Sequence, residues 1–181
     1  MRLGALGHGL QQGGRDDLVG GVDAAQIKGV LPLSLSALRS TLPVFKNPAN
    51  KHRAVSLTAD QFHYSFGNAL TAEDSAELCE RWTIPAPGQP LFEAAEANFS
   101  LHSPAKVNTK NEGRGPLLLI MGGQDHTVPE AITKSTLKQY RHSRAVTNLH
   151  EFPDRCHSLT IDSGWRAVAG ECLNWLNKQG I

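Results

Sequence analysis

The sequence predicts an α/β fold in which a few parallel strands are flanked by helices. First, an unbroken apolar run at residues 117–121 follows a Gly-Pro turn and ends at two glycines, as strands covered on both faces do. Second, residues 130–141 carry apolar side chains suited to a packed helix, and residues 146–152 form a second apolar segment. Third, a strand, a helix and a strand in this order return the chain parallel to itself.

The length and composition agree with one domain that has no nucleic-acid or membrane partner. A chain of 181 residues can bury a core, and 18 basic against 17 acidic residues leave a formal net charge of +1. No apolar run approaches the roughly 20 residues that span a bilayer, and the N-terminus lacks the apolar core of a signal peptide. The three cysteines show no paired spacing, so we expect reduced thiols in the cytoplasm and no zinc site.

Residues 1–26 are expected to be a leader with one short strand. Residues 1–21 contain seven glycines, and residues 11–17 show neither helical nor strand periodicity. Residues 18–23 predict the short strand. The Gly7-x-Gly9 pair lacks the third glycine of a dinucleotide fingerprint, and no strand precedes it, so no such cofactor is expected.

Residues 27–108 are expected to be mainly helical. Apolar residues at helical spacing begin the region and end around Pro48. Thr58 and Gln61 have the spacing of a capping box, which predicts the start of the next helix. Four helices are expected, at residues 35–45, from Thr58, from Thr71, and at residues 91–99.

Asp125 and His157 each follow one of the two predicted strands. Because the loops after parallel strands lie on the same edge of a sheet, with adjacent strands about 5 Å apart, we expect the two side chains to meet. A carboxylate bound to one imidazole nitrogen fixes the tautomer and leaves the other nitrogen to act as a base. The alternative is that Asp125 is only a cap or turn residue before the helix that Pro129 begins.

These two loops resemble those of the α/β-hydrolase family. Gly-Gly-Gln-Asp125-His-Thr-Val-Pro is similar to the family's acid motif, and Asp-Arg-Cys-His157-Ser is similar to its histidine loop. The last segment resembles the family's closing helix: Asp162 or Ser163 would cap it and Gly180 would end it. Its apolar stripe would comprise Trp165, Val168, Ala169, Cys172 and Leu176.

The resemblance is good from Gly115 to Ile181 and extends back to about Ile27. It implies a partial α/β-hydrolase fold, with residues 27–108 as a helical cap and residues 109–181 as the C-terminal part of the core. It also implies an esterase-like activity on a small-molecule substrate, without cofactor or metal. His157 would be the base and Asp125 its partner. The cap would contribute Phe62, Trp82 and Phe92 to an acyl pocket that His126 faces; the alternative is that these aromatic residues only pack the cap against the sheet.

The nucleophile is the missing part of this resemblance. The family's Gly-x-Ser-x-Gly elbow does not occur in these 181 residues. The most similar segment is Gly7-His8-Gly9, which has glycine where the elbow has serine. We therefore predict a hydrolase by ancestry that hydrolyses little or nothing alone. The alternatives are a non-catalytic remnant that binds a small apolar ligand under the cap, and a fragment without function.

Overall fold

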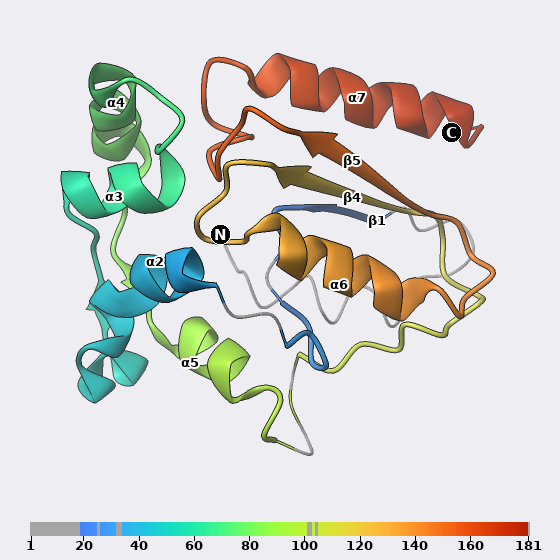
Figure 1. Ribbon diagram of the computed structural model, residues 1–181, viewed down its shortest axis with the longest axis horizontal. Coiled ribbons are helices and arrows are strands. Elements are labelled where there is room, and N and C mark those ends of the chain that lie inside the picture. Colours follow the sequence, from blue (N-terminus) through green and yellow to red (C-terminus); the bar gives the residue numbers. More distant parts are fainter. Residues whose placement is uncertain (1–18, 25, 32–33, 101–102, 104, 181) are drawn as a thin grey trace.

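In the described part of the chain, the core sheet has three parallel strands. The computed structural model describes residues 19–24, 26–31, 34–100, 103 and 105–180. The strands β1 (Val19–Val22), β4 (Leu117–Gly122) and β5 (Thr147–Phe152) lie in the order β1-β4-β5 (Figure 1). In the parallel register Val22 is paired with Ile120, and Gly122 with Phe152. The predicted α/β class with parallel strands is confirmed.

The central strand β4 is buried along its whole length because a helix covers each face of the sheet. Its alternate side chains belong to two clusters, as the two-residue period of a strand requires. Helix α7 (Trp165–Lys178) packs on one face, and helix α6 (Glu130–Tyr140) lies on the other. The first cluster contains Leu118, Ile120, Leu159, Val168 and Trp175; the second contains Leu117, Leu119 and Tyr140, with Leu137 packed against it.

Two expectations for the closing helix are wrong. Helix α7 has Gly164 at its N-cap and no side-chain capping bond, because the Asp162 carboxylate is already held by Arg155 and by the Gly164 N–H. Trp165 is 43% exposed, and Trp175 takes its place in the core. Gly180 does lie at the predicted stop, with a left-handed φ of +81° that suits glycine.

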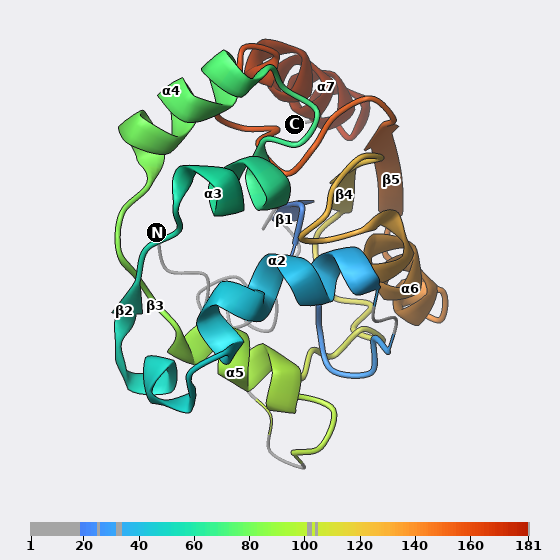
Figure 2. The same cartoon turned by 60° about the vertical axis from the view of Figure 1, so that its left-hand side comes forward.

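The four helices expected within residues 27–108 are present beyond the carboxyl ends of β4 and β5 (Figures 1 and 2). The predicted capping box is confirmed, since Thr58 and Gln61 exchange both of its hydrogen bonds. A short 3-10 helix and a two-stranded antiparallel pair were not expected, because they are too short to have a periodic pattern. The bounds are α2 Leu35–Phe45, 3-10 helix Pro48–His52, β2 Ala54–Val55, α3 Ala59–Phe66, α4 Ala72–Trp82, β3 Ala86–Pro87 and α5 Gln89–Glu96.

The short strand expected within the leader is present as β1, and it belongs to the core sheet beside β4. The remainder of that leader, including Gly7-His8-Gly9, lies in residues 1–18, outside the described residues. All three cysteines are free thiols. Within the described part of the chain, no helix has the length and apolar character needed to cross a bilayer.

Candidate functional site

Asp125 lies in the loop that follows β4, and its two carboxylate oxygens have separate partners. Oδ1 accepts hydrogen bonds from the backbone N–H groups of Thr127 at 2.7 Å and Val128 at 2.8 Å. Oδ2 lies 2.7 Å from Nδ1 of His157. The residue is buried. Asp125 is therefore both the turn residue and the partner of the imidazole, so the two interpretations of this position do not exclude each other.

His157 lies in the loop after β5, which is joined to the acid loop by backbone hydrogen bonds. The N–H of Gly123 donates to Phe152 O, and the N–H of Gln124 donates to Arg155 O, both at 2.9 Å. In the tautomer that carries its proton on Nδ1, His157 donates this hydrogen bond to the Asp125 carboxylate. The expected contact between Asp125 and His157 is thus present. The catalytic role of the pair stays a prediction.

The C-terminal end of α3 lies against both loops. The last carbonyl groups of a helix have no partner inside the helix and must find one elsewhere. Three of those in α3 accept hydrogen bonds from the acid and histidine loops, so the helical region is attached directly to the site. The pairs are Tyr64 O with His126 Nδ1 at 2.9 Å, Ser65 O with Thr127 Oγ1 at 2.7 Å, and Phe66 O with Ser158 N at 3.1 Å.

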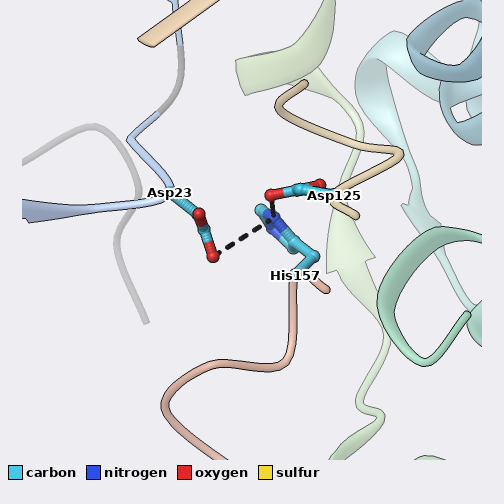
Figure 3. A group of neighbouring side chains, drawn as sticks. All are labelled: Asp23, Asp125 and His157. Atoms are coloured by element: carbon cyan, nitrogen blue, oxygen red, sulfur yellow. Dashed lines mark hydrogen bonds and ion pairs between the residues drawn. The ribbon is translucent and has the colours of Figure 1, made fainter. Parts of the chain in front are cut away.

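A second carboxylate, Asp23, reaches the same imidazole from the end of β1, and the sequence interpretation missed it. Oδ1 of Asp23 accepts from the Gly122 N–H at 3.2 Å, and Oδ2 lies 3.9 Å from Nδ1 of His157 (Figure 3). Oδ2 has no hydrogen-bond partner among the described residues, although the side chain is only 5% exposed. The signal in the sequence is a carboxylate directly after a short strand, within residues that the sequence predicts to be a leader.

The pKa values of Asp23 and His157 are both raised within this cluster. Burial, reinforced by the nearby Asp125 and opposed by His157, raises the pKa of Asp23 from 3.8 to about 7. Burial alone would lower the pKa of His157, but the hydrogen bond and charge of Asp125, with the charge of Asp23, outweigh it and raise that pKa. The site therefore holds protons more tightly than the unfolded chain does.

The shifts of Asp23 and His157 each contribute stability that is lost as the pH rises. Between the unfolded pKa of Asp23, 3.8, and its folded value of about 7, the folded chain binds more protons, so the free energy of unfolding falls with pH. The raised pKa of His157 acts in the same direction from about pH 6.5 upward. The Asp23 shift corresponds to at most about 4 kcal/mol.

Urea unfolding at pH 5 and pH 8 measures this effect in the native chain and in Asp23→Asn. The amide keeps an acceptor for the Gly122 N–H but has no charge to bury. We expect a smaller difference between the two pH values in the variant, mainly because it is more stable than the native chain at pH 8. Parallel pH dependences in the two proteins would contradict the assignment.

The cluster has the composition of a metal site, but one of its distances is shorter than that between two ligands of a tetrahedral zinc ion. Ligand atoms of Asp23, Asp125 and His157 all lie within 4.8 Å of one another. Ligands of a tetrahedral zinc ion at about 2.0 Å would be about 3.3 Å apart. The Nδ1–Oδ2 distance of 2.7 Å is instead that of a charge-assisted hydrogen bond. We interpret the three groups as an acid–base cluster.

Two of the four residues expected in the pocket, Phe62 and His126, are connected to the site by ring contacts or hydrogen bonds. Phe62 is buried and stacks on Phe66 at 5.2 Å, and the Phe66 ring lies 4.7 Å edge-on from His157. His126 is held under α3, with its ring 4.6 Å from that of Tyr64. Phe62 therefore supports the ring that touches the imidazole, and does so by packing.

Trp82 and Phe92 have no contact with the Asp125–His157 pair in the described residues. Trp82 is half-exposed at the end of α4, and Phe92 packs edge-on against Phe45 at 5.0 Å.

A hollow of about 150 Å³ lies between α2 and α3, well below the roughly 300–1,000 Å³ of typical small-molecule sites. Its lining residues, which include none of the clustered three, are Arg39, Pro43, Asp60, Gln61, Tyr64 and Ser65.

No nucleophile accompanies the imidazole. Every serine, threonine and cysteine of the sequence falls within the described residues, and none of them is hydrogen-bonded to His157. Its sequence neighbours are occupied elsewhere: Sγ of the fully buried Cys156 lies 3.3 Å from Ser158 Oγ, which donates to Asp162 at 3.0 Å. The Asp125–His157 pair therefore has no hydroxyl or thiol side chain hydrogen-bonded to it at the imidazole.

No protein-family model matches this chain, and no curated protein matches its sequence. The interpretation of the site consequently depends on geometry, namely a fixed carboxylate and an imidazole at the carboxyl edge of a parallel sheet.

Proposed function

We propose that Asp125 and His157 are the acid and the base of an α/β-hydrolase-type site for an ester or a similar small acyl substrate. The observation that carries this proposal is the 2.7 Å bond between Nδ1 of His157 and a carboxylate that two backbone N–H groups hold in place. Such a bond orients the imidazole and stabilises its cationic form, so that Nε2 can accept a proton.

The arrangement of the chain supports the same proposal. A helical segment is inserted between β1 and β4, it lies beyond the carboxyl ends of the strands, and its helix α3 contacts both loops of the site. These are the features expected of a cap on a partial α/β-hydrolase core. We accordingly assign residues 27–108 to the cap and residues 109–181, together with β1, to the core. A cytoplasmic location belongs to the same proposal.

In the proposed reaction, a hydroxyl oxygen attacks the acyl carbonyl while His157 takes the hydroxyl proton on Nε2. The cationic imidazole, paired with Asp125, then gives that proton to the leaving oxygen as the carbonyl re-forms. Because no side-chain hydroxyl lies at the imidazole, this hydroxyl must come from an added alcohol, from water or from another chain. Loss of the nucleophile costs on the order of 10⁶ in rate in one well-studied protease. The chain alone should hydrolyse esters slowly or not at all.

An added alcohol tests this proposal. p-Nitrophenyl esters from acetate to octanoate would be offered to the native chain, to His157→Ala and to His52→Ala, an exposed histidine outside the site. Without alcohol, we expect the same slow release of nitrophenol from all three proteins. With ethanol, we expect ethyl ester to form faster with the native chain and with His52→Ala than with His157→Ala, measured by gas chromatography.

Equal ethyl ester formation in all three proteins would contradict the role of His157 as a base. Hydrolysis without alcohol that disappears in His157→Ala and passes through an acyl-protein intermediate, detected by mass spectrometry, would contradict the missing nucleophile and would show that another group of this chain attacks the substrate. The same loss without such an intermediate would show that His157 activates water.

A further inference from the structure

Two carboxyl groups approach the same nitrogen of one imidazole. Oδ2 of Asp125 lies 2.7 Å from Nδ1 of His157, and Oδ2 of Asp23 lies 3.9 Å from the same atom (Figure 3). Asp23 is therefore on the side of the ring that the orienting acid occupies, and not at Nε2, where a nucleophile would have to be. Its position is that of a second orienting acid.

The unpaired oxygen of Asp23 indicates a proton in this cluster. Oδ1 of Asp23 is satisfied by the Gly122 N–H, whereas Oδ2 is buried without a hydrogen-bond partner among the described residues. One oxygen of each of the two carboxyl groups lies within 4.8 Å of the other. Two ionised carboxylates at this separation, both removed from water, would repel each other and leave a buried charge unpaired. One proton held by the two carboxyl groups removes both costs.

The backbone holds Asp23 in this position. Its N–H donates to Ile120 O at 3.0 Å, which continues the β1–β4 ladder by one residue. It then has a φ of +44°, a left-handed conformation that few residues other than glycine adopt and that persists only where the surroundings fix it. The side chain is thereby placed against the end of β4, beside the loop that carries Asp125.

We propose that Asp23 is a positioning residue for His157, which shares one proton with Asp125 and can replace Asp125 as the hydrogen-bond partner of Nδ1. The exchange requires Asp23 to approach Nδ1 by about 1 Å, from 3.9 Å to the usual length of a charge-assisted hydrogen bond. Its catalytic consequence depends on the proposed function, but the arrangement of protons does not.

Among the described residues, the charged groups that shift the pKa values of Asp23 and His157 are the members of the cluster itself. Asp23 faces His157 and Asp125, and His157 faces the same two carboxyl groups, with the apolar ring of Phe66 against it. Arg155, in the same loop as His157, is paired with Asp162. Asp23 and His157 should consequently titrate in coupled steps.

Nuclear magnetic resonance of histidine-labelled full-length chain tests the proposal between pH 4 and pH 9. The native chain would be compared with Asp23→Asn, Asp125→Asn and the double variant. Asp154→Asn is the matched control, because Asp154 is an exposed carboxylate in the histidine loop. The signals of His157 are assigned by their absence in His157→Gln.

We expect the His157 titration midpoint of Asp23→Asn to fall by about one pH unit, with one step where the native chain has two. The downfield signal of the hydrogen-bonded Nδ1–H should persist in Asp125→Asn and disappear in the double variant. Asp154→Asn should match the native chain.

An unchanged His157 titration in Asp23→Asn would overturn the proposal, as would a downfield signal lost equally in Asp125→Asn and in the double variant. If Asp125→Asn does not fold, the Asp23→Asn titration decides alone. Neither readout needs a substrate, so a failure of the ester experiment and a failure here are separate results.

Discussion

Gly122→Ala should destabilise the protein by about 3 kcal/mol and separate Asp125 from His157. A Cβ at position 122 would lie 2.5 Å from Arg155 O and 3.0 Å from Cys156 O, both backbone atoms of the histidine loop. Overpacking of this kind costs about 1–3 kcal/mol, and each backbone hydrogen bond broken as the loops part adds about 1 kcal/mol. The hydrogen bond that we expect to break first is the one that the Gln124 N–H donates to Arg155 O.

Gly170→Ala is the matched control for this variant. Gly170 lies inside α7, and a Cβ there would meet nothing within 4 Å. The same chemical change should therefore stabilise the protein, by about 0.5–1 kcal/mol, because alanine is the better helix residue. Urea unfolding measures both variants, and the downfield Nδ1–H signal of His157 reports on the site. A Gly122→Ala variant as stable as the native chain would show that the two loops are not in close contact.

Asp125→Ala should be the most destabilising change at the site, by about 3–5 kcal/mol. It removes a buried acceptor from three donors, the N–H groups of Thr127 and Val128 and Nδ1 of His157. Each buried donor left without a partner costs about 1–3 kcal/mol. Asp125→Asn keeps an amide oxygen for the two backbone groups and loses only the charged bond to the imidazole, so we expect it to cost about half as much.

Urea unfolding at one pH compares the two Asp125 variants. The difference between them measures the turn-forming role of the carboxylate, and the remaining cost of the asparagine variant measures its bond to His157. Equal destabilisation by the two substitutions would mean that Oδ1 does not hold the loop. A neutral effect of both would mean that the carboxylate is not the buried centre of this site.

The contact between Asp125 and His157 could be predicted because it follows from short-range patterns. The apolar run of β4, the helical spacing of α6 and the β5 segment each identify an element locally, and the crossover rule then places both loops at one edge. The capping of α7 was predicted wrongly, because Asp162 binds Arg155, a residue of the preceding loop. The rings of Trp82 and Phe92 illustrate a further limit, since composition identifies an aromatic residue but not the helix it packs against.

The sequence by itself determined the parallel sheet, the helical region beyond its carboxyl edge, and the acid and histidine at that edge, because each is encoded in periodic or bounded segments. Only the tertiary structure decided that Asp23 joins them. Strand β1 has four residues, two of them glycine, and carries no periodic signal. The hydrogen bond from the Gly122 N–H to the Asp23 side chain joins residues 99 positions apart. It depends on parallel pairing between distant segments, which no local pattern records.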